Sequence, residues 1–343
     1  MTVRVGINGF GRIGRSFTRA LLARGSDTTV ELVAVNDPFG DSETMAFLLK
    51  HDSVGGVLPN HVVATDGGFS IDGREIRKLE EREPSAIPWR DADVDVVIES
   101  TGLFTTRETA SAHLVGGAKR VVISAPSGDA DAMICMGVND EVFDPSKDQV
   151  ISNASCTTNC LAPMAKVLHD RFGIEHGLIT TVHAYTSDQQ LQDQATATRT
   201  GKPDLRRMRA AALSIIPNST GAARAIGTVL PELKGRLDGM ALRVPTPTGS
   251  ITDLVATLAR KVSVEEVNAA FEAAAADPAF RGVLEYSNEP LVSADIVGNP
   301  SSCVFSSVDT MVSGPSVKVL GWYDNEWGYS NRLIDLVSFI GEQ

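Results

Sequence analysis

The feature that most limits the possible fold is a glycine-rich turn near the start of the chain. Residues Gly9–Gly14 read G-F-G-R-I-G and directly follow an apolar run, Thr2–Ile7, that predicts a short strand. A helical pattern over Arg15–Arg24 comes next. A strand, this turn and a helix in that order are typical of the first βαβ unit of a dinucleotide-binding sheet. The glycines at Gly9 and Gly11 permit a tight turn and let the backbone approach a pyrophosphate closely.

Strand and helix patterns continue to alternate over the first 150 or so residues. Further strands are expected at Thr29–Val35, Val94–Glu99, Arg120–Ser124 and Gln149–Ser152, with a helix at Thr105–Gly116. These strands are short, rich in Val and Ile and largely uncharged, as in buried parallel sheets. The predicted fold class is therefore α/β, with a Rossmann-type doubly wound parallel sheet in this part of the chain.

The second half of the chain has longer, alternating strand patterns and fewer helices. Strands are expected at Leu178–Ala184, Met240–Val244, Thr252–Leu258 and Val304–Thr310, and helices at Val264–Ala275 and Asn331–Ile340. This pattern predicts an α+β catalytic domain with a largely antiparallel sheet. The polar segment Gln189–Pro203 has little periodicity and is expected to be a long loop, and loops of that length are usually functional.

Composition limits the class of protein. A chain of 343 residues is long enough for two domains, and its net charge of −12 argues against general binding to nucleic acid or to an anionic membrane. We see neither a signal peptide nor a membrane span, so we expect a cytoplasmic protein. The four cysteines do not form a disulfide framework, and the six scattered histidines have no zinc-ligand spacing, so no metal is expected.

Asp37 ends the second expected strand, at the usual distance from the glycine turn. A carboxylate there accepts hydrogen bonds from both ribose hydroxyls and repels a 2′-phosphate, which favours NAD over NADP. The alternative is a turn residue before Pro38.

Cys156 lies among small polar residues in Ser152–Leu161, where an apolar helical pattern begins. A thiol at a helix N-terminus meets unpaired N–H groups and the positive end of the helix dipole, and both favour the reactive thiolate. We therefore expect a nucleophile, although a small buried apolar side chain is the commoner role of a free cysteine. Pro163 falls inside the pattern and is expected to kink the helix.

A thiolate needs a base and groups that bind its substrate. His183 ends an apolar strand and is followed by hydroxyl and carboxylate residues, although a structural hydrogen bond is its commoner role. A helix start near Pro217 and four arginines, Arg206, Arg207, Arg209 and Arg243, could bind phosphate. Surface salt bridges are the alternative for these arginines, and the residues alone do not choose among them.

The chain resembles the phosphorylating, NAD-dependent glyceraldehyde-3-phosphate dehydrogenases of bacteria over essentially its whole length. The resemblance rests on segments in matching order, which include Val5–Arg15 (VGINGFGRIGR), Val122–Ser127 (VISAPS), Ser152–Cys160 (SNASCTTNC), Thr181–Gln189 (TVHAYTSDQ) and Trp322–Arg332 (WYDNEWGYSNR). The cysteine segment and the Trp-Tyr-Asp-Asn-Glu segment are highly specific.

The resemblance implies a role for each matching residue. Cys156 would be the nucleophile and His183 its base. The contacts to NAD would come from Gly9, Gly11, Arg12, Ile13, Asp37, Arg82, Ser124 and Asn325, with Tyr329 packed near the nicotinamide. The substrate phosphate would lie near Thr186, Asp188 and Arg243. The aldehyde and inorganic phosphate would lie near Ser155, Thr157, Arg207, Thr220 and Gly221.

The resemblance also implies the reaction. Cys156 would add to glyceraldehyde 3-phosphate as a thiohemiacetal, oxidation by NAD would give a thioester, and inorganic phosphate would release 1,3-bisphosphoglycerate. A homotetramer is implied, with 1–155 and 331–343 as the NAD-binding domain and 156–330 as the catalytic domain, including the loop 186–209. The rival interpretations are an erythrose-4-phosphate dehydrogenase, which uses water on the thioester, and a non-enzymatic NAD-binding regulator.

The chain departs from the usual bacterial pattern in one loop. Residues 190–203 (QLQDQATATRTGKP) are about six residues longer than the short form of the family, and Met208 and Asn218 replace residues that are usual there. Because these changes lie near the site and the catalytic set is intact, one hypothesis is a secondary isoform that tolerates a thiol-directed inhibitor.

Overall fold

The computed structural model describes residues 2–195 and 204–343, which divide into two compact units. The first unit comprises the described residues up to Ile134, together with Glu141–Ala154 and Ser330–Gln343, and the second comprises Cys135–Asp140 and the described part of Ser155–Tyr329. The part of the expected loop that spans 196–203 lies outside the described residues.

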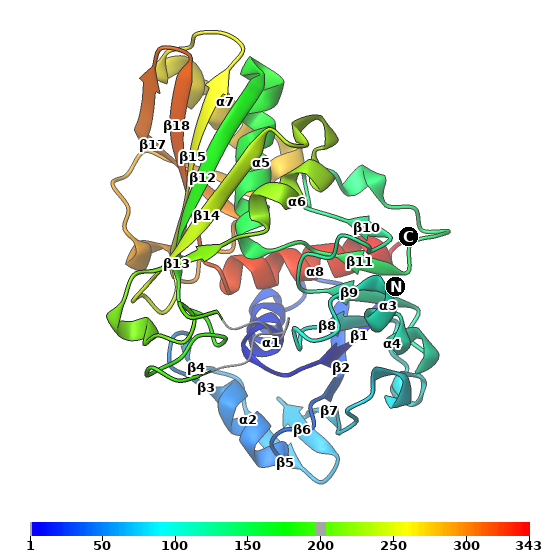
Figure 1. The fold of residues 1–343 in the computed structure, drawn as a ribbon. Helices are drawn as coiled ribbons and strands as arrows, with labels where there is room; N and C mark the ends of the chain where they lie inside the picture. The colour runs from blue at the N-terminus through cyan, green and yellow to red at the C-terminus, as the bar shows by residue number, and fades with distance from the viewer. Residues whose placement is uncertain (1, 196–203) are drawn as a thin grey trace. The chain divides into compact units, whose positions relative to one another are not determined.

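The first unit is built on a nine-stranded sheet (Figure 1) in the order β10-β11-β9-β8-β1-β2-β7-β6-β5. Its strands are β1 Val3–Asn8, β2 Val30–Asn36, β5 Val62–Thr65, β6 Gly68–Ile71, β7 Arg74–Leu79, β8 Val96–Glu99, β9 Arg120–Ile123, β10 Ala132–Met133 and β11 Val150–Ser152. Pairing is parallel from β10 to β7 and antiparallel from β7 to β5. The predicted doubly wound parallel sheet is confirmed. The antiparallel extension was missed because charged residues interrupt β7.

Helices of the first unit differ from the prediction at particular capping residues. The helices are α1 Arg12–Arg24, α2 Ser42–Lys50, α3 Arg107–Ala110, α4 Ala112–Val115 and the C-terminal α8 Trp327–Gly341. The first residues of α8 belong to the second unit. Two short strands, β3 His51–Asp52 and β4 Gly56–Val57, follow α2. The single helix expected at Thr105–Gly116 is wrong. The Ser111 hydroxyl donates to the carbonyl of Glu108 at 2.8 Å, and such side-chain bonds compete with helix continuation. The missed α2 begins where the Asp41 carboxylate accepts the N–H of Thr44 at 2.8 Å.

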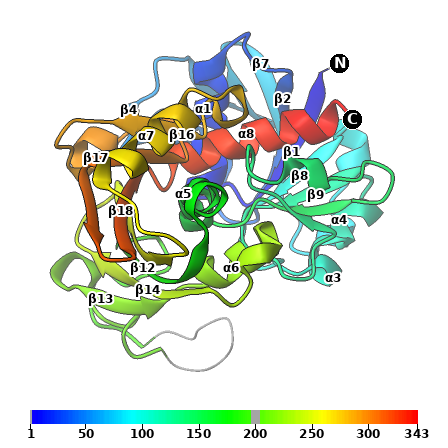
Figure 2. The ribbon, with the colours of Figure 1, turned by 90° about the horizontal axis from the view of Figure 1, so that it is seen from above.

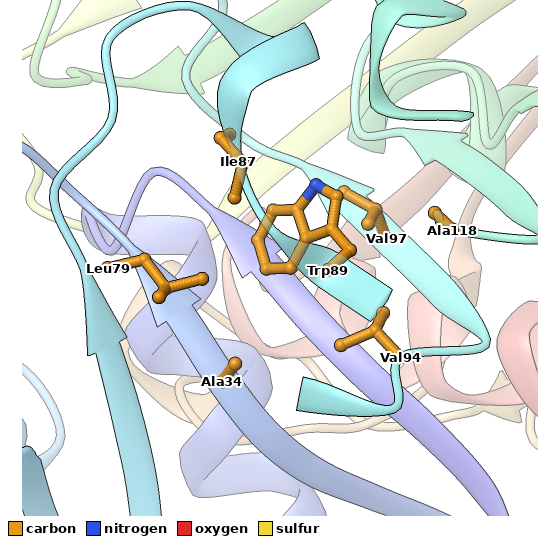
Figure 3. Close-up of a cluster of buried hydrophobic side chains, with 7 residues drawn as sticks. All are labelled: Ala34, Leu79, Ile87, Trp89, Val94, Val97 and Ala118. Carbon is orange, nitrogen blue, oxygen red and sulfur yellow. The ribbon is translucent and has the colours of Figure 1, made fainter. Parts of the chain in front are cut away.

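Trp89 is the largest fully buried side chain of the first unit. Figure 3 shows its ring over the strands, among Ala34, Leu79, Ile87, Val94, Val97 and Ala118. A Cβ on Gly6 of β1 would lie only 2.6 Å from the indole ring, so this strand position requires glycine. Because side chains alternate along a strand, Gly6 and Asn8 share the Trp89 face of the sheet.

The second unit contains a seven-stranded sheet in the order β13-β14-β12-β15-β18-β17-β16. Its strands are β12 Ile174–Ala184, β13 Ile216–Ser219, β14 Leu237–Val244, β15 Ser250–Leu258, β16 Leu284–Ser287, β17 Cys303–Ser313 and β18 Ser316–Tyr323. Only the pairs β12–β14 and β16–β17 are parallel, so the largely antiparallel sheet is confirmed. Helices α5 Cys156–Phe172, α6 Ala222–Val229 and α7 Val264–Ala275 lie on one side of it (Figure 2).

Two helices of the second unit show how local sequence sets their bounds. Helix α7 has the predicted bounds, and Ser263 and Glu266 form a reciprocal capping box at its start. Helix α5 continues through Pro163 for a further nine residues, to Phe172. Among the described residues, no helix combines the length and the apolar character that a bilayer span requires.

Candidate active site

Cys156 is the first residue of α5, at the point where the chain leaves β11. Ala154, two residues earlier, has a φ of +53°, a conformation uncommon outside glycine and often found at functional turns. Ser155 is the N-cap, and its hydroxyl accepts the N–H of Thr158 at 3.1 Å. Cys156 is partly exposed as a residue, whereas Cys135, Cys160 and Cys303 are buried, and none of the four is in a disulfide.

His183 lies one residue before the end of β12 and faces this thiol. Its Nε2 is 3.4 Å from Sγ of Cys156, within hydrogen-bonding distance for sulfur, and the imidazole is only 3% exposed. A strand of one sheet and a helix packed on it therefore bring together two residues that are 27 apart in the chain. Their geometry is that of a nucleophile and its base.

The second ring nitrogen of His183 has two competing partners. Nη1 of Arg243 lies 2.6 Å from Nδ1, and the carbonyl oxygen of Ala184 lies 2.7 Å from it. A protonated Nδ1 donates to the carbonyl and leaves Nε2 free to accept the thiol proton. An unprotonated Nδ1 accepts from Arg243 and places the proton on Nε2. Each tautomer has a partner at both ring nitrogens, but the Nδ1–H tautomer turns that proton toward Ala184 and leaves the Arg243 N–H to donate to the Ala184 carbonyl alone. Only in this tautomer can Nε2 accept the thiol proton.

Burial and charge keep both groups neutral in this state. Burial, followed by the Arg243 cation, lowers the pKa of His183 to about 3, against a smaller opposing effect of the Ala184 carbonyl. Burial also raises the pKa of Cys156, although Arg243 and the hydroxyl and N–H of Thr157 oppose it. The hydroxyl and N–H of Thr157 at the helix N-terminus do favour the thiolate, but desolvation of the charge outweighs them in this state.

Tyr323 ties the elements that carry the two groups. Its hydroxyl is 2.9 Å from Oγ1 of Thr157, next to the nucleophile, and 2.8 Å from Oγ1 of Thr181, on β12. The ring lies edge-on to His183, with centroids 5.8 Å apart. This buried bridge fixes the first turn of α5 against β12 and so holds the distance between sulfur and imidazole.

The residues expected to bind phosphate form two groups. Arg207 pairs with Asp188 at 2.6 Å, and the hydroxyl of Thr186 donates to that same carboxylate. The structure thus joins Arg207, expected at the inorganic phosphate, to the set expected at the substrate phosphate, whereas Arg243 contacts His183 instead. The remaining residues of the inorganic-phosphate set lie at two helix starts of the second unit: Ser155 and Thr157 on α5, Thr220 and Gly221 on α6.

The glycine turn of the first unit fits a dinucleotide. A Cβ on Gly11 would meet no atom within 4 Å, so the backbone can be approached closely there. Gly11 is also the N-cap of α1, and no side chain covers this end of the helix. Asp37 accepts the N–H of Phe10 at 2.9 Å and remains partly exposed, with lone pairs available to ribose hydroxyls.

The other expected cofactor contacts are divided between the units. In the first, Arg12 pairs with Asp52, Ile13 and Ser124 are partly buried, and Arg82 lies over the ring of Phe39 at 5.2 Å. In the second, Asn325 is buried and its side-chain oxygen accepts from the hydroxyl of Ser250 at 2.9 Å. Tyr329, also in the second unit, is buried too.

Two family models match the chain. The NAD binding domain of glyceraldehyde 3-phosphate dehydrogenase matches residues 3–107, and the C-terminal domain of the same enzyme matches residues 155–325. The chain belongs to the glyceraldehyde-3-phosphate dehydrogenase family. Among curated relatives, glyceraldehyde-3-phosphate dehydrogenase 2 of Streptomyces arenae is 59% identical, with 99% of each chain covered. The enzymes named glyceraldehyde-3-phosphate dehydrogenase in Streptomyces coelicolor and Mycolicibacterium smegmatis are 58% and 57% identical, over 100% of this chain and 100% and 99% of theirs.

Membership of the glyceraldehyde-3-phosphate dehydrogenase family did not lead us to every residue that supports the site. The bridge through Tyr323 was missed, although this tyrosine belongs to the matching segment Trp322–Arg332. Asp52, the partner of Arg12, was also missed. For Tyr323 the sequence signal was a polar group at the end of a buried strand, and for Asp52 it was a polar group near a glycine pair. Either signal identifies a residue that supports the site only once its partner is known.

Proposed function

We propose that this chain is a phosphorylating glyceraldehyde-3-phosphate dehydrogenase. It would convert glyceraldehyde 3-phosphate and inorganic phosphate to 1,3-bisphosphoglycerate with NAD as the oxidant. The observation that carries the proposal is the contact of Cys156 Sγ with His183 Nε2, beside an arginine and in a chain of this family. The first unit would be the NAD-binding domain and the second the catalytic domain.

Catalysis would begin at sulfur. His183 Nε2 takes the thiol proton as Sγ of Cys156 attacks the aldehyde carbon, and returns it to the aldehyde oxygen, which gives a thiohemiacetal. The imidazole then accepts the hydroxyl proton of this adduct while the carbon is oxidised to a thioester. NAD, when bound, supplies the acceptor for the hydride. An oxygen of inorganic phosphate next attacks the thioester carbon, the carbon–sulfur bond breaks, and the acyl phosphate leaves while Sγ of Cys156 takes the proton back from the imidazole.

Arg243 would couple substrate binding to this chemistry. It donates to the Ala184 carbonyl at 2.9 Å and lies against Nδ1 of His183, where its charge lowers the pKa of the imidazole. The phosphate of the substrate is a stronger acceptor for a guanidinium than a neutral imidazole is. An arginine drawn to that phosphate leaves Nδ1–H to the Ala184 carbonyl, so the base becomes stronger when the substrate is present.

The second anion, inorganic phosphate, would be bound near α5 and α6. Ser155 and Thr157 supply hydroxyls at the start of α5, and Thr220 and Gly221 precede the first turn of α6. Arg207, now paired with Asp188 and Asp204, is the cation that could turn to either phosphate. Exchange of a carboxylate partner for a phosphate keeps such an arginine paired at each stage.

The cofactor would lie on the glycine turn of the first unit. Gly9, Gly11, Arg12 and Ile13 would contact the pyrophosphate, Asp37 the adenosine ribose, and Arg82 and Ser124 the flanking groups. Asn325 and Tyr329 would contribute at the nicotinamide.

Assembly as a homotetramer is part of the proposal. On the face of the seven-stranded sheet opposite α5, Leu178 pairs with Val255, and Met240 of β14 lies alongside. These side chains are 67%, 42% and 39% exposed, and exposed apolar side chains gathered on one sheet face are typical of a subunit interface. We propose a cytoplasmic enzyme whose partners are its substrates and its own copies, without nucleic acid or membrane.

The test is the formation of NADH from glyceraldehyde 3-phosphate and NAD, with and without inorganic phosphate. Phosphate-dependent turnover in the wild type and its loss in Cys156→Ser are expected. Turnover that does not respond to phosphate would assign a hydrolysing dehydrogenase, such as one acting on erythrose 4-phosphate. The absence of turnover would favour a binding protein.

A further inference from the structure

A buried carboxylate lies at the point of the first sheet where the strand order reverses. The chain proceeds from β1 to β2 and β7 on one side and then returns to β8 and β9 on the other, so β1 and β8 flank the reversal. Dinucleotides bind at the carboxyl ends of the strands there. Asn8 ends β1, Glu99 ends β8, and the two are paired across it. Glu99 is only 1% exposed.

The direction of the hydrogen bonds that reach Glu99 from β2 is fixed by the backbone. The N–H of Glu81 donates to Oδ1 of Asn36 at 2.8 Å, and Nδ2 of Asn36 donates to the Glu81 carbonyl at 2.8 Å. The same Nδ2 donates to Oδ1 of Asn8 at 2.7 Å. Nδ2 of Asn8 must therefore donate onward, and it reaches Oε2 of Glu99 at 2.6 Å.

A second chain of donors reaches Glu99 through His113. The indole Nε1 of Trp89, which can only donate, lies 3.1 Å from Nδ1 of His113. Nδ1 must be unprotonated, so the proton of this neutral imidazole is on Nε2, which lies 3.0 Å from Oε2 of Glu99. The apolar cluster drawn in Figure 3 surrounds the Trp89 ring and so holds its N–H in place.

Thr101 donates two hydrogen bonds to the other carboxylate oxygen of Glu99. Oε1 of Glu99 accepts the N–H of Thr101 at 2.8 Å and also its hydroxyl. Asn8, His113 and Thr101 are all neutral donors to this carboxylate, and an ionised carboxylate accepts hydrogen bonds without donating any. The Thr101 N–H, Asn8 Nδ2 and His113 Nε2 can only donate in this arrangement, so Glu99 is the acceptor on which they converge.

The same contacts control the glycine turn. A Cβ on Gly9 would lie 2.8 Å from the N and 2.9 Å from the Cα of Thr101, so the backbone that Glu99 holds packs directly on this glycine. Ser100 Oγ donates to the carbonyl of Gly9 at 2.7 Å, and the N–H of Gly9 donates to the carbonyl of Asn36 at 2.8 Å. Thr101 donates to the Glu99 carboxylate, and Asn36 belongs to the chain of amides that ends on that carboxylate. The backbone around Gly9 is therefore held by groups that are bonded to Glu99 directly or through Asn8.

We propose that Glu99, as the shared acceptor at the end of these two donor chains, is a positioning residue that holds Gly9 and Thr101 in the conformation that binds NAD. Trp89 keeps Nδ1 of His113 unprotonated, so that His113 presents one fixed proton, on Nε2, to Glu99. The inference rests on the proposed function only in taking NAD as the ligand of the glycine turn. It assigns no contact between Glu99 and the cofactor.

The first test is Glu99→Gln in the full-length protein, with NAD affinity measured by calorimetry. The amide places its own N–H against neighbours that are all donors, so we expect the NAD dissociation constant to rise at least about tenfold. The alkylation rate of Cys156 without cofactor should stay within about twofold, because Glu99 and Cys156 belong to different compact units and residues without shared partners are usually independent. Val150→Ala is the matched control, since it destabilises the same sheet within a different buried cluster and should leave NAD affinity unchanged.

The second test does not depend on a variant that folds. Nitrogen-15 NMR of the wild-type histidines should place the His113 proton on Nε2, since a proton on Nδ1 would lose the hydrogen bond from Trp89. In Trp89→Phe, which removes only the N–H donor and keeps an aromatic ring, we expect this tautomer preference to be lost and NAD affinity to fall.

The outcomes separate this inference from the proposed function. A wild-type protein that fails to bind NAD would overturn the proposed function, whatever the state of His113. Tight NAD binding in the wild type and an unchanged dissociation constant in Glu99→Gln would overturn the positioning role alone. An imidazolium at His113, or NAD affinity reduced equally in Val150→Ala, would do the same.

Discussion

His113 and His183 are the two most deeply buried histidines of this chain, and they differ in how their protons are held. His113 receives the indole N–H of Trp89 at one nitrogen and donates to Glu99 at the other, so a single tautomer is satisfied. His183 has a cation and a carbonyl at the same nitrogen and a thiol at the other, so two tautomers are satisfied. Similar burial therefore gives one fixed proton and one transferable proton.

The difference indicates which buried polar site is built for structure and which for chemistry. When several donors converge on one acceptor, no proton is free to move, and the hydrogen-bonded groups are held rigidly. A histidine between competing partners can carry its proton on either nitrogen, and a general base needs the tautomer whose free nitrogen faces the acid. Burial and an altered pKa alone would not have distinguished the two.

The largest expected effect comes from Arg243, the competing partner of His183. In Arg243→Ala we expect kcat/KM for glyceraldehyde 3-phosphate to fall about 10²- to 10³-fold, because a charge-assisted contact to phosphate is lost. Turnover of glyceraldehyde, which has no phosphate, should fall much less or rise, since the base is relieved of a neighbouring cation. Steady-state kinetics with the two aldehydes measures the contrast, and equal losses on both would contradict this role of Arg243.

An intermediate effect is expected on acid stability. The pKa of His183 is about 3 in the folded protein and about 6.5 in the unfolded chain, so the unfolded state binds more protons below pH 6.5. The stability due to a neutral His183 is fully present above pH 6.5 and decreases as the pH falls toward 3, by up to about 1.4 kcal/mol per pH unit. His183→Gln should lose less stability than the wild type in urea unfolding between pH 7 and pH 5. Parallel pH dependences would show that the imidazole charges in the folded state.

The smallest expected effect concerns the bridge that sets the distance between Cys156 and His183. Tyr323→Phe removes a hydroxyl held by Thr157 and Thr181, and we expect unfolding to become easier by about 1–2 kcal/mol. The alkylation rate of Cys156 should change a few-fold, because its distance from the imidazole is no longer fixed. Denaturant unfolding and alkylation kinetics on the same sample test both effects, and an altered thermal stability with unchanged thiol reactivity would make Tyr323 a purely structural residue.

Local patterns were sufficient to predict the doubly wound sheet, the antiparallel sheet and helix α7. They failed where charge interrupts a strand, as in β7, and where a serine side chain bonds to its own helix, as at Ser111. Bounds also shifted where a carboxylate just before a helix caps it. Asp324 accepts the N–H groups of Glu326 and Trp327 at 2.9 and 2.8 Å, so α8 begins earlier than the apolar pattern suggests.

The site was predicted only in part, for a physical reason. A nucleophile and a base can be proposed from residue type and neighbours, and Cys156 and His183 do meet in the structure. Charge states depend on long-range partners, so the desolvation of Cys156 and the place of Arg243 beside the imidazole could not be derived from local sequence. Nor could the convergence on Glu99, since two of its three donors, Asn8 and His113, come from other segments of the chain.

The most direct test of this account is a single-turnover measurement of NADH formation at saturating NAD in His183→Gln and His113→Gln. We predict a fall of about 10²-fold or more in His183→Gln, because the transferable proton is lost. In His113→Gln the rate should stay within a few-fold of the wild type once NAD is saturating, because only positioning of the cofactor turn is impaired. Equal losses in the two variants, or an unaffected His183→Gln, would contradict the distinction between a fixed and a transferable proton.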